Sequence, residues 1–303
     1  MAKILIKNGR VWDGEKFYFA DVLTDGEKII KIEDKIKETA DFEYNARNKI
    51  VSAGLVDVHT HLRGINKEFG IHAELSCIPF GVTSVADACG VYGDKALLDS
   101  FLVKNVIFVP VQIRENKAFF DSVESGLIKY GEKVVGLKVY FDTQVSDVKD
   151  ETPLYEAVEY AKKHGLIVMV HSSNSPVSMA KLLSVLRKGD ILTHAYHGGT
   201  NNVSDDNYEC IKKAKDNGII IDAGLAGHIH TDFNVLKSGI ACGAEPDIIS
   251  TDITRFSSYK RGGRYGMTMC MNIAQKLGMN EEDIFRAVTS VPAKSLGKEN
   301  TWV

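Results

Sequence analysis

The stretch VDVHTHLRG, residues 56–64, joins an apolar run typical of a buried strand to two histidines, His59 and His61. Alternate side chains of a strand lie on the same face, so the two imidazoles point the same way and can bind one ion. The stretch predicts a buried strand that leads into a metal site. The remaining chain must then supply both the sheet and further ligands.

Seven more apolar, β-branched runs follow the first one, separated by helix-like stretches such as LYEAVEYAKKHG. The eight runs are LVDVHTHL, VTSVADA, VIFVPVQI, VVGLKVYF, LIVMVHS, ILTHAY, IIIDAG and DIISTDI. Near-continuous apolar strands alternating with helices are typical of a buried parallel sheet. Eight of them predict an α/β fold of the closed (β/α)8 TIM-barrel type, which we expect over residues 54–303.

The first 53 residues have a different pattern. ILIKNGRVW alternates around an expected Asn8-Gly9 turn, and DVLTDGEKIIKIED alternates around an expected Asp25-Gly26 turn. We therefore expect residues 1–53 to form a small, β-sandwich-like N-terminal module.

Composition limits the class of protein. The chain has 303 residues, 44% of them hydrophobic and 25% charged, which fits one large domain with an appendage. Its formal net charge is -3 and its 37 Lys and Arg residues are not gathered in one block, which argues against nucleic acid or a membrane as partner. Five cysteines without a CxxC pattern indicate reduced thiols. We expect a cytoplasmic protein, a homo-oligomer, that acts on a small molecule.

Polar side chains stand at the expected carboxyl ends of five strands, where a barrel builds its active site. They are His59, His61, Lys138, His171, His194 and Asp252. A lone histidine is more often a hydrogen-bonded core residue, but four with an aspartate favour Zn²⁺ or a similar divalent ion. A carboxylate beside the metal can shuttle a proton, which makes Asp252 the expected catalytic residue.

Lys138 is the unusual member of this set, because an ammonium group would repel a dication. It must be deprotonated or chemically changed to belong to the site. Reaction with CO₂ would turn it into a carbamate able to bridge two metals. The alternative is a structural or substrate-binding lysine.

The motifs VDVHTHLRG, GLKVYF, VMVHSSN, DILTHAYHG and ISTDIT, in this order, resemble the amidohydrolase superfamily with a binuclear site, of the dihydroorotase-like type. Within it they resemble the amidohydrolase/deacetylase group. The resemblance extends from Lys3 to Leu296. It implies that His59, His61 and Asp252 bind the more buried metal. It further implies that His171 and His194 bind the second, and that carbamylated Lys138 bridges the two.

Three features depart from this pattern. Arg63 in HLRG stands where dihydroorotases bind a substrate carboxylate and where deacetylase relatives often have an apolar residue. The chain stops at AKSLGKENTWV, where dihydroorotase-like proteins add strands to the N-terminal module, so the module is smaller here or the chain is truncated. The seventh strand ends in DAGLAGHIH, so His228 or His230 either replaces a substrate-facing histidine or belongs only to the loop.

The expected enzyme is a metal-dependent amidohydrolase. A hydroxide bridging two divalent ions, expected to be zinc, would attack an amide or ester carbonyl, and Asp252 would take its proton. We expect Arg63, Asn174, His228 and Arg255 to bind substrate, and the guanidinium groups favour an anion such as an N-acyl amino acid. The alternatives are a cyclic amidohydrolase of the dihydroorotase type, which Arg63 supports, and a non-catalytic protein with this fold.

Overall fold

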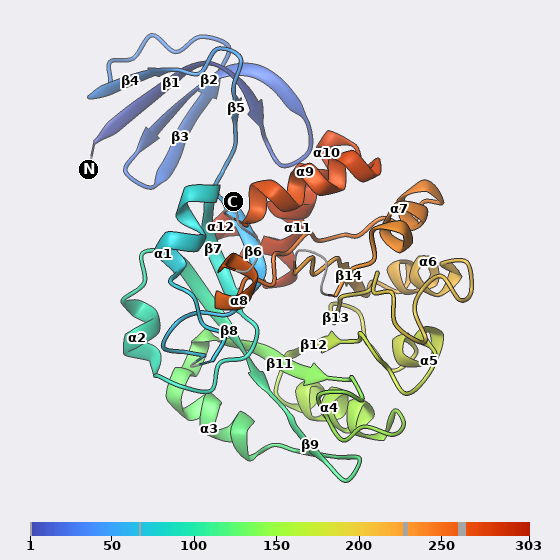
Figure 1. Ribbon diagram of the computed structural model, residues 1–303. Coiled ribbons are helices and arrows are strands. Elements are labelled where there is room, and N and C mark those ends of the chain that lie inside the picture. The colour runs from blue at the N-terminus through green and yellow to red at the C-terminus, as the bar shows by residue number, and fades with distance from the viewer. Residues whose placement is uncertain (1, 67, 227–229, 260–264) are drawn as a thin grey trace.

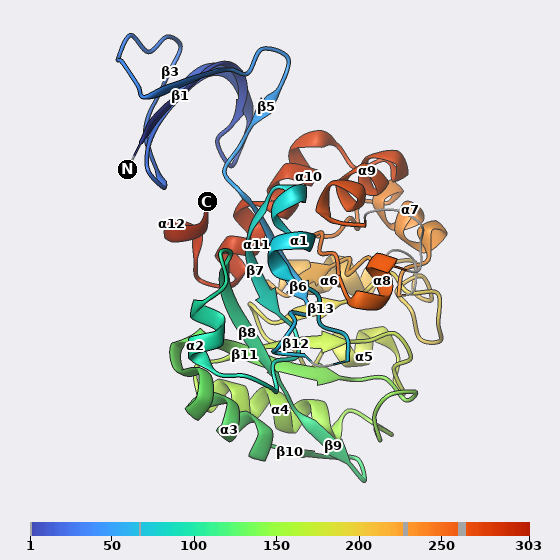
Figure 2. The ribbon, with the colours of Figure 1, turned by 60° about the vertical axis from the view of Figure 1, so that its left-hand side comes forward.

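The computed structural model describes residues 2–66, 68–226, 230–259 and 265–303. The N-terminal strands are β1 (Lys3–Trp12), β2 (Phe17–Asp25), β3 (Lys28–Glu33), β4 (Phe42–Asn45) and β5 (Ile50–Val51). They form one five-stranded sheet in the order β3-β2-β1-β4, with β5 also paired to β1. The expected small β module is therefore present, and Figure 2 shows it as a strongly curved layer at one end of the molecule.

The predicted Asn8-Gly9 turn is wrong. β1 runs straight through these residues as a bulged strand, whose register against β2 shifts between Ile6 and Gly9. Asn8 takes the left-handed conformation at φ 61°, and its N–H donates to Asp21 Oδ1 at 2.8 Å. A β-bulge and a tight hairpin turn both use a residue that tolerates positive φ. The Asn-Gly pair alone therefore does not distinguish a bulge from a turn. The turn at Asp25 and Gly26 does connect β2 to β3.

The larger sheet is parallel. Its seven strands run in the order β14-β13-β12-β11-β8-β7-β6. They are β6 (Leu55–Thr60), β7 (Val82–Asp87), β8 (Lys104–Pro110), β11 (Val134–Tyr140), β12 (Ile167–His171), β13 (Ile191–Thr193) and β14 (Ile220–Asp222). A short hairpin of β9 (Gln112–Arg114) and β10 (Lys117–Phe119) extends from β8.

The eighth predicted strand, residues 247–253, is not a regular strand. It makes isolated parallel bridges to both edges of the sheet, Ile248 to Asp222 of β14 and Ile253 to Thr60 of β6. The backbone N–H of His61 also donates to the carbonyl of Ile253 at 3.1 Å. The prediction of eight strands is thus confirmed in part: seven form a curled sheet, and this segment links its two edges.

Most helices pack around the outside of the curled sheet (Figure 1), but Ala293 and Trp302 from the last two helices pack inside it. The helices are α1 (Ala73–Ser76), α2 (Lys95–Asp99), α3 (Asp121–Tyr130), α4 (Thr152–Lys163), α5 (Met179–Leu183), α6 (Glu209–Asp216), α7 (Phe233–Ala241), α8 (Arg255–Tyr259), α9 (Met267–Leu277), α10 (Glu281–Val288), α11 (Ser290–Ser295) and α12 (Glu299–Trp302). Local sequence explains their ends. Asn280 caps α10 by accepting the N–H of Asp283 at 2.9 Å, and acidic residues fill the first turn. None of the described helices is both long and apolar enough to cross a bilayer.

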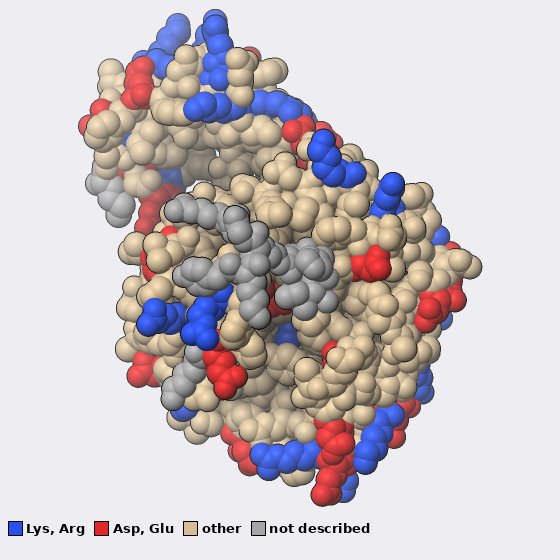
Figure 3. Space-filling view, viewed as in Figure 1, with Lys and Arg blue, Asp and Glu red and all other residues tan. Residues whose placement is uncertain are grey.

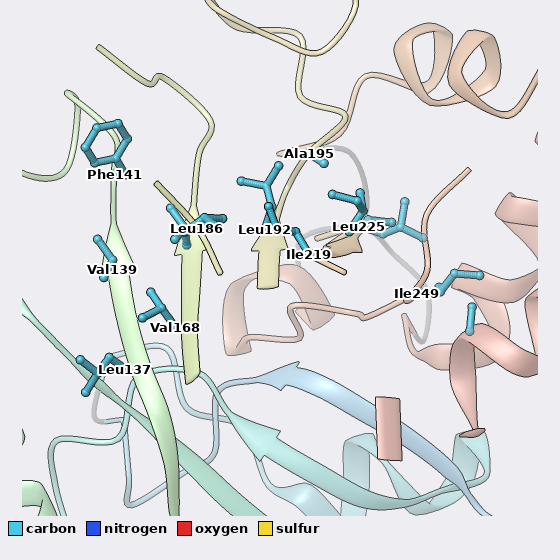
Figure 4. Packing of buried hydrophobic residues seen from close by; sticks show 14 of the residues in the cluster. Leu137, Val139, Phe141, Val168, Leu186, Leu192, Ala195, Ile219, Leu225 and Ile249 are labelled. Carbon is cyan, nitrogen blue, oxygen red and sulfur yellow. The ribbon is translucent and has the colours of Figure 1, made fainter. Parts of the chain in front are cut away.

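Strand alternation divides the core into two layers. In β12, Val168 and Val170 belong to a large cluster shared with the surrounding helices, whereas Met169 belongs to a second cluster inside the curl. Leu137 and Val139 of β11 likewise face outward, as Figure 4 shows. The residue two positions after Met169 therefore also faces the interior, at the carboxyl end of the sheet. This alternation places His171 there.

The N-terminal sheet packs on the helices near the carboxyl terminus of the chain. The indole N–H of Trp12 donates to Thr289 Oγ1 at 3.0 Å, and the Trp12 ring contacts those of Phe17 and Phe285. Arg10 and Glu281 form an ion pair at 2.7 Å. On the face drawn in Figure 3, acidic and basic side chains of the described residues are interspersed, apart from some basic side chains gathered on this sheet.

Candidate metal centre

The two histidines of the first motif lie at a bulge in β6. The register of β6 against β7 shifts between Asp57 and Thr60. The buried carboxylate of Asp57 holds this bulge by accepting the backbone N–H groups of His59 and Thr251, at 3.3 and 3.1 Å. A bulge changes the face on which the next side chain lies. His59 thereby faces the interior although its neighbour Val58 also belongs to the inner cluster.

Asp252 contacts both histidines. Its Oδ1 lies 3.3 Å from His59 Nε2 and 3.0 Å from His61 Nε2, and its Oδ2 lies 3.8 Å from His194 Nε2. Both Asp252 and His194 have left-handed backbone conformations, with φ of 46° and 62°. Such conformations cost roughly 1–3 kcal/mol in residues other than glycine, and they gather at functional sites. The backbone is therefore strained where these two side chains meet.

A buried hydrogen-bond chain fixes the orientation of His59. Thr193 Oγ1 donates to Asp222 Oδ2 at 2.7 Å and lies 3.0 Å from His59 Nδ1. Since the hydroxyl hydrogen goes to Asp222, Thr193 accepts from Nδ1, and His59 Nε2 is left as an acceptor. Lys138 Nζ lies 3.1 Å from that Nε2. These hydrogen bonds orient His59 so that the lone pair of its Nε2 faces the Nζ atom of Lys138.

The other two histidines are also oriented by partners. His171 Nε2 lies 3.1 Å from Asp142 Oδ2, and His194 Nδ1 lies 2.7 Å from the carbonyl of Gly224. The two rings meet with their centroids 4.6 Å apart. Each imidazole uses one nitrogen for orientation, so its second nitrogen remains for an ion.

Burial sets the charge state of the cluster. It lowers the pKa of His171 to about 4 and holds the pKa of His59 and His194 well below the ordinary value, so the imidazoles are neutral. Burial also lowers the pKa of the Lys138 ammonium to about 8. Asp252 is different: burial raises its pKa, but His59 and His61 outweigh that effect and hold the pKa well below its usual range. The site thus combines neutral imidazoles with an anionic carboxylate.

The structure brings all six predicted ligand residues together. They are His59, His61, Lys138, His171, His194 and Asp252. All six are buried, with at most 7% of any one exposed.

The sequence analysis did not identify Asp142 as part of the cluster and did not decide the role of His230. Asp142 orients His171, and only its position after β11 could have suggested it, because sequence spacing does not show which loop carboxylate turns inward. His230, for which two interpretations were open, lies in the cluster: its ring centroid is 4.8 Å from that of His171 and 4.5 Å from that of His194. His228 lies outside the described residues.

The expected substrate-binding residues lie around the cluster rather than in it. Arg63 is exposed, and its Nη1 lies 3.0 Å from His72 Nε2. Asn174 is half-buried and donates to Asp142 Oδ2 at 3.1 Å. Arg255 is exposed at the start of α8, where its backbone N–H donates to the carbonyl of Phe69 at 2.7 Å.

Phe69 connects the helix of Arg255 to the histidine cluster. Its ring lies 6.3 Å from that of His61 and 5.7 Å from that of Phe256. Both phenylalanines are partly exposed, with relative accessibilities of 43% and 37%. Phe69 therefore lies beside the cluster and contacts Phe256 of the helix that begins at Arg255.

The donor set fits divalent metal ions. Among the described residues, two groups place one ligand atom per residue within 4.8 Å of one another: His59, His194 and Asp252, and His171, His194 and His230. His61 Nδ1 is buried without a hydrogen-bond partner among the described residues, so this nitrogen is also available to an ion. Neutral imidazole and carboxylate are the ligands that zinc and similar ions prefer.

Comparison with known proteins agrees with the site. No family model matches the chain. A protein named deacetylase from Enterococcus faecalis is 26% identical over 96% of this chain and 84% of its own length. A protein named dihydroorotase from Ligilactobacillus salivarius is 28% identical, over 62% of this chain and 46% of its own length.

Solved structures share the fold. A dihydroorotase aligns with a TM-score of 0.83 and 23% identity over 98% of this chain and 84% of its own. An adenine deaminase aligns with a TM-score of 0.84 and 23% identity over 97% of this chain and 84% of its own. The predicted resemblance is confirmed, because the chain matches relatives named deacetylase and dihydroorotase, and these relatives support a hydrolase that acts on C–N bonds. The solved structures support the fold.

Proposed function

From this relationship, we propose that the chain is a metal-dependent hydrolase that cleaves the amide or ester bond of a small anionic substrate, such as an N-acyl amino acid. Two divalent ions, expected to be zinc, would be held by His59, His61, His171, His194 and Asp252. A carbamate on Lys138 would complete the ligand set.

The convergence of these side chains carries the proposal. They come from the ends of several strands of the curled sheet and from the segment that links its two edges, yet contacts of 3.0 to 3.8 Å join Asp252 to His59, His61 and His194. Core histidines with purely structural roles pair with backbone or hydroxyl groups, and they do not gather around one carboxylate. Two curated relatives with different names, deacetylase and dihydroorotase, also support C–N bond hydrolysis as the reaction class.

Bound divalent ions would lower the pKa of a water molecule and polarise the substrate carbonyl. The residues of the chain divide the remaining work. Asp252, anionic and in contact with two histidines, accepts the proton of the attacking water at its carboxylate and passes it to the leaving nitrogen. Asp57, Asp142 and Asp222 hold the histidines in place from behind.

The substrate anion is assigned to the two arginines. Both side chains are exposed, so the Arg63 guanidinium, now beside His72, and the Arg255 guanidinium, now over the Phe256 ring, could turn toward a carboxylate and bind it in bidentate fashion. The aromatic pair Phe69 and Phe256 next to His61 supplies an apolar surface for the acyl group.

The second candidate is ring opening of a cyclic amide. The relative named dihydroorotase favours it, because ring opening needs the same metal chemistry. Purified protein with known zinc content, assayed on a panel of N-acyl amino acids and on dihydroorotate, separates the two. Release of free amino acid supports the deacylase, and ring opening supports the rival. If the purified protein binds no metal and hydrolyses neither class of substrate, the result would support the third alternative, a non-catalytic protein with this fold.

A further inference from the structure

The half-buried His230 lies beside two histidines of the centre. It comes from the loop between β14 and α7, and its ring stands 4.8 Å from that of His171 and 4.5 Å from that of His194. Its Nδ1 lies 3.0 Å from the hydroxyl of Ser173, two residues after His171. The loop after β12 therefore anchors the ring supplied by the loop after β14.

All three rings are oriented in the same manner. One nitrogen of each is engaged: His171 Nε2 with Asp142, His194 Nδ1 with the Gly224 carbonyl, and His230 Nδ1 with Ser173. One ligand nitrogen from each ring lies within 4.8 Å of the other two. Two nitrogens bound to one tetrahedral zinc ion lie roughly 3.4 Å apart, so closure needs only modest ring shifts.

Their chemistry also fits one ion. Burial lowers the pKa of all three imidazoles below the ordinary value, so the rings are neutral and do not repel a cation as imidazolium groups would. Three imidazoles and one open position form a catalytic zinc site of a familiar kind. No hydrophobic or hydrogen-bonding role would require three imidazole rings to converge in this way.

We propose that His230 is a third imidazole ligand of the ion held by His171 and His194. This inference rests on the proposed metal dependence and adds a ligand to it. Because Gly224 occupies His194 Nδ1, His194 has a single nitrogen to offer and serves this ion alone. His59, His61 and Asp252 are then left for the other ion. The three-imidazole site holds its ion whether or not Lys138 carries a carbamate.

Titration of the metal-free full-length chain with Co²⁺, followed by visible absorption and by metal analysis, tests this. The variants are His230→Ala and His230→Asn, the second of which keeps a polar side chain for contact with Ser173. His164→Ala is the matched control, because His164 is an exposed histidine stacked on Tyr160, away from the centre. Thermal unfolding of each metal-free variant checks that it folds.

We expect the wild type and His164→Ala to bind two ions. Both His230 variants should bind one of them more than about 10-fold more weakly, since even partners outside the ligand shell change metal affinity by that much. In CO₂-free buffer, Lys138→Ala should still bind one ion, and Lys138→Ala/His230→Ala should bind it more weakly again. Wild-type affinity for both ions in the two His230 variants would overturn the inference and leave the proposed function standing. A wild type that binds no ion would refute the proposed function itself.

Discussion

The Nζ atom of Lys138 lies 3.1 Å from Nε2 of His59, in a part of the core from which solvent is excluded. An ammonium group there is removed from bulk water, and this burial lowers its pKa to about 8. Lysine at this position is therefore unusually easy to deprotonate. The free amine is also the form that reacts with CO₂.

The first prediction follows from that pKa. Below pH 8 the amine is mainly protonated and cannot attack CO₂, and above it the amine is mainly free, so carbamylation of metal-free protein should rise as the pH rises through about 8. Carbon-13 NMR with labelled bicarbonate at pH 6.5 and 9 measures this. The carbamate signal should be absent from Lys138→Ala, whose lost activity should return in part with formate. An active, fully metallated enzyme with a free Lys138 amine would contradict it.

The second prediction concerns Asp252. Replacement by Asn keeps the shape of the side chain but removes the base, so kcat should fall by about 10²- to 10⁴-fold, the usual contribution of a positioned acid–base group. Most metal should remain, because the histidines are unchanged. Steady-state kinetics with metal analysis of the same sample decide the matter. A near-normal kcat in the metallated variant would assign the proton transfer to another group.

Much of the fold was predictable, because buried parallel strands can be recognised in the sequence as short apolar runs. Six of the seven strands of the larger sheet fall within predicted runs, and β8 begins two residues before its run. The eighth run, residues 247–253, has the apolar composition of a buried strand. It does not form a regular strand, because the backbone takes a positive φ at Asp252. Local composition does not reveal strain imposed by the site.

The site was predictable where ligands stand directly after strands, since strand direction fixes their location. Asp142 and His230 were harder, because both come from loops whose path depends on tertiary contacts such as that between His230 and Ser173. The orientation of the Arg63 side chain was equally hard to predict, because it depends on the contact with His72, nine residues further along the chain.

The third prediction tests Arg63 as the carboxylate-binding residue. Arg63→Met should raise KM for N-acyl amino acids by about 10-fold or more, as loss of a charge-assisted bidentate pair does, and change KM little for the matching neutral amides. Arg114→Met is the control, because Arg114 is an exposed arginine on β9 that donates to Gln112. Equal effects on charged and neutral substrates would make Arg63 a structural residue.

The fourth prediction concerns the contact between the N-terminal sheet and the helices. Trp12→Ala removes a ring packed against Phe17 and Phe285, and it should lower the free energy of unfolding by about 3–5 kcal/mol. Trp12→Phe keeps an aromatic ring and loses the hydrogen bond to Thr289, for a cost of about 1 kcal/mol. Urea unfolding measures both. Two equal values would show that ring packing contributes little here.

The last prediction isolates the hydrogen-bond chain behind His59. Thr193→Val preserves shape but removes the hydroxyl that joins Asp222 to His59 Nδ1. Asp222 keeps Ser250 Oγ and the Gly224 N–H as donors at 2.8 and 3.2 Å, so its carboxylate stays partnered and the chain should fold.

His59, however, loses the acceptor that fixes its tautomer and ring angle. The affinity for the ion at His59 should fall by about 10- to 100-fold, the range found when a partner of a metal-binding histidine is removed. Thr193→Ser keeps the hydroxyl and should bind as the wild type does. Competition with a chelator of known affinity gives the constants. If the Val variant held zinc as tightly as the Ser variant, ring packing alone would orient His59, and the Asp222–Thr193 pair would serve only the stability of the core.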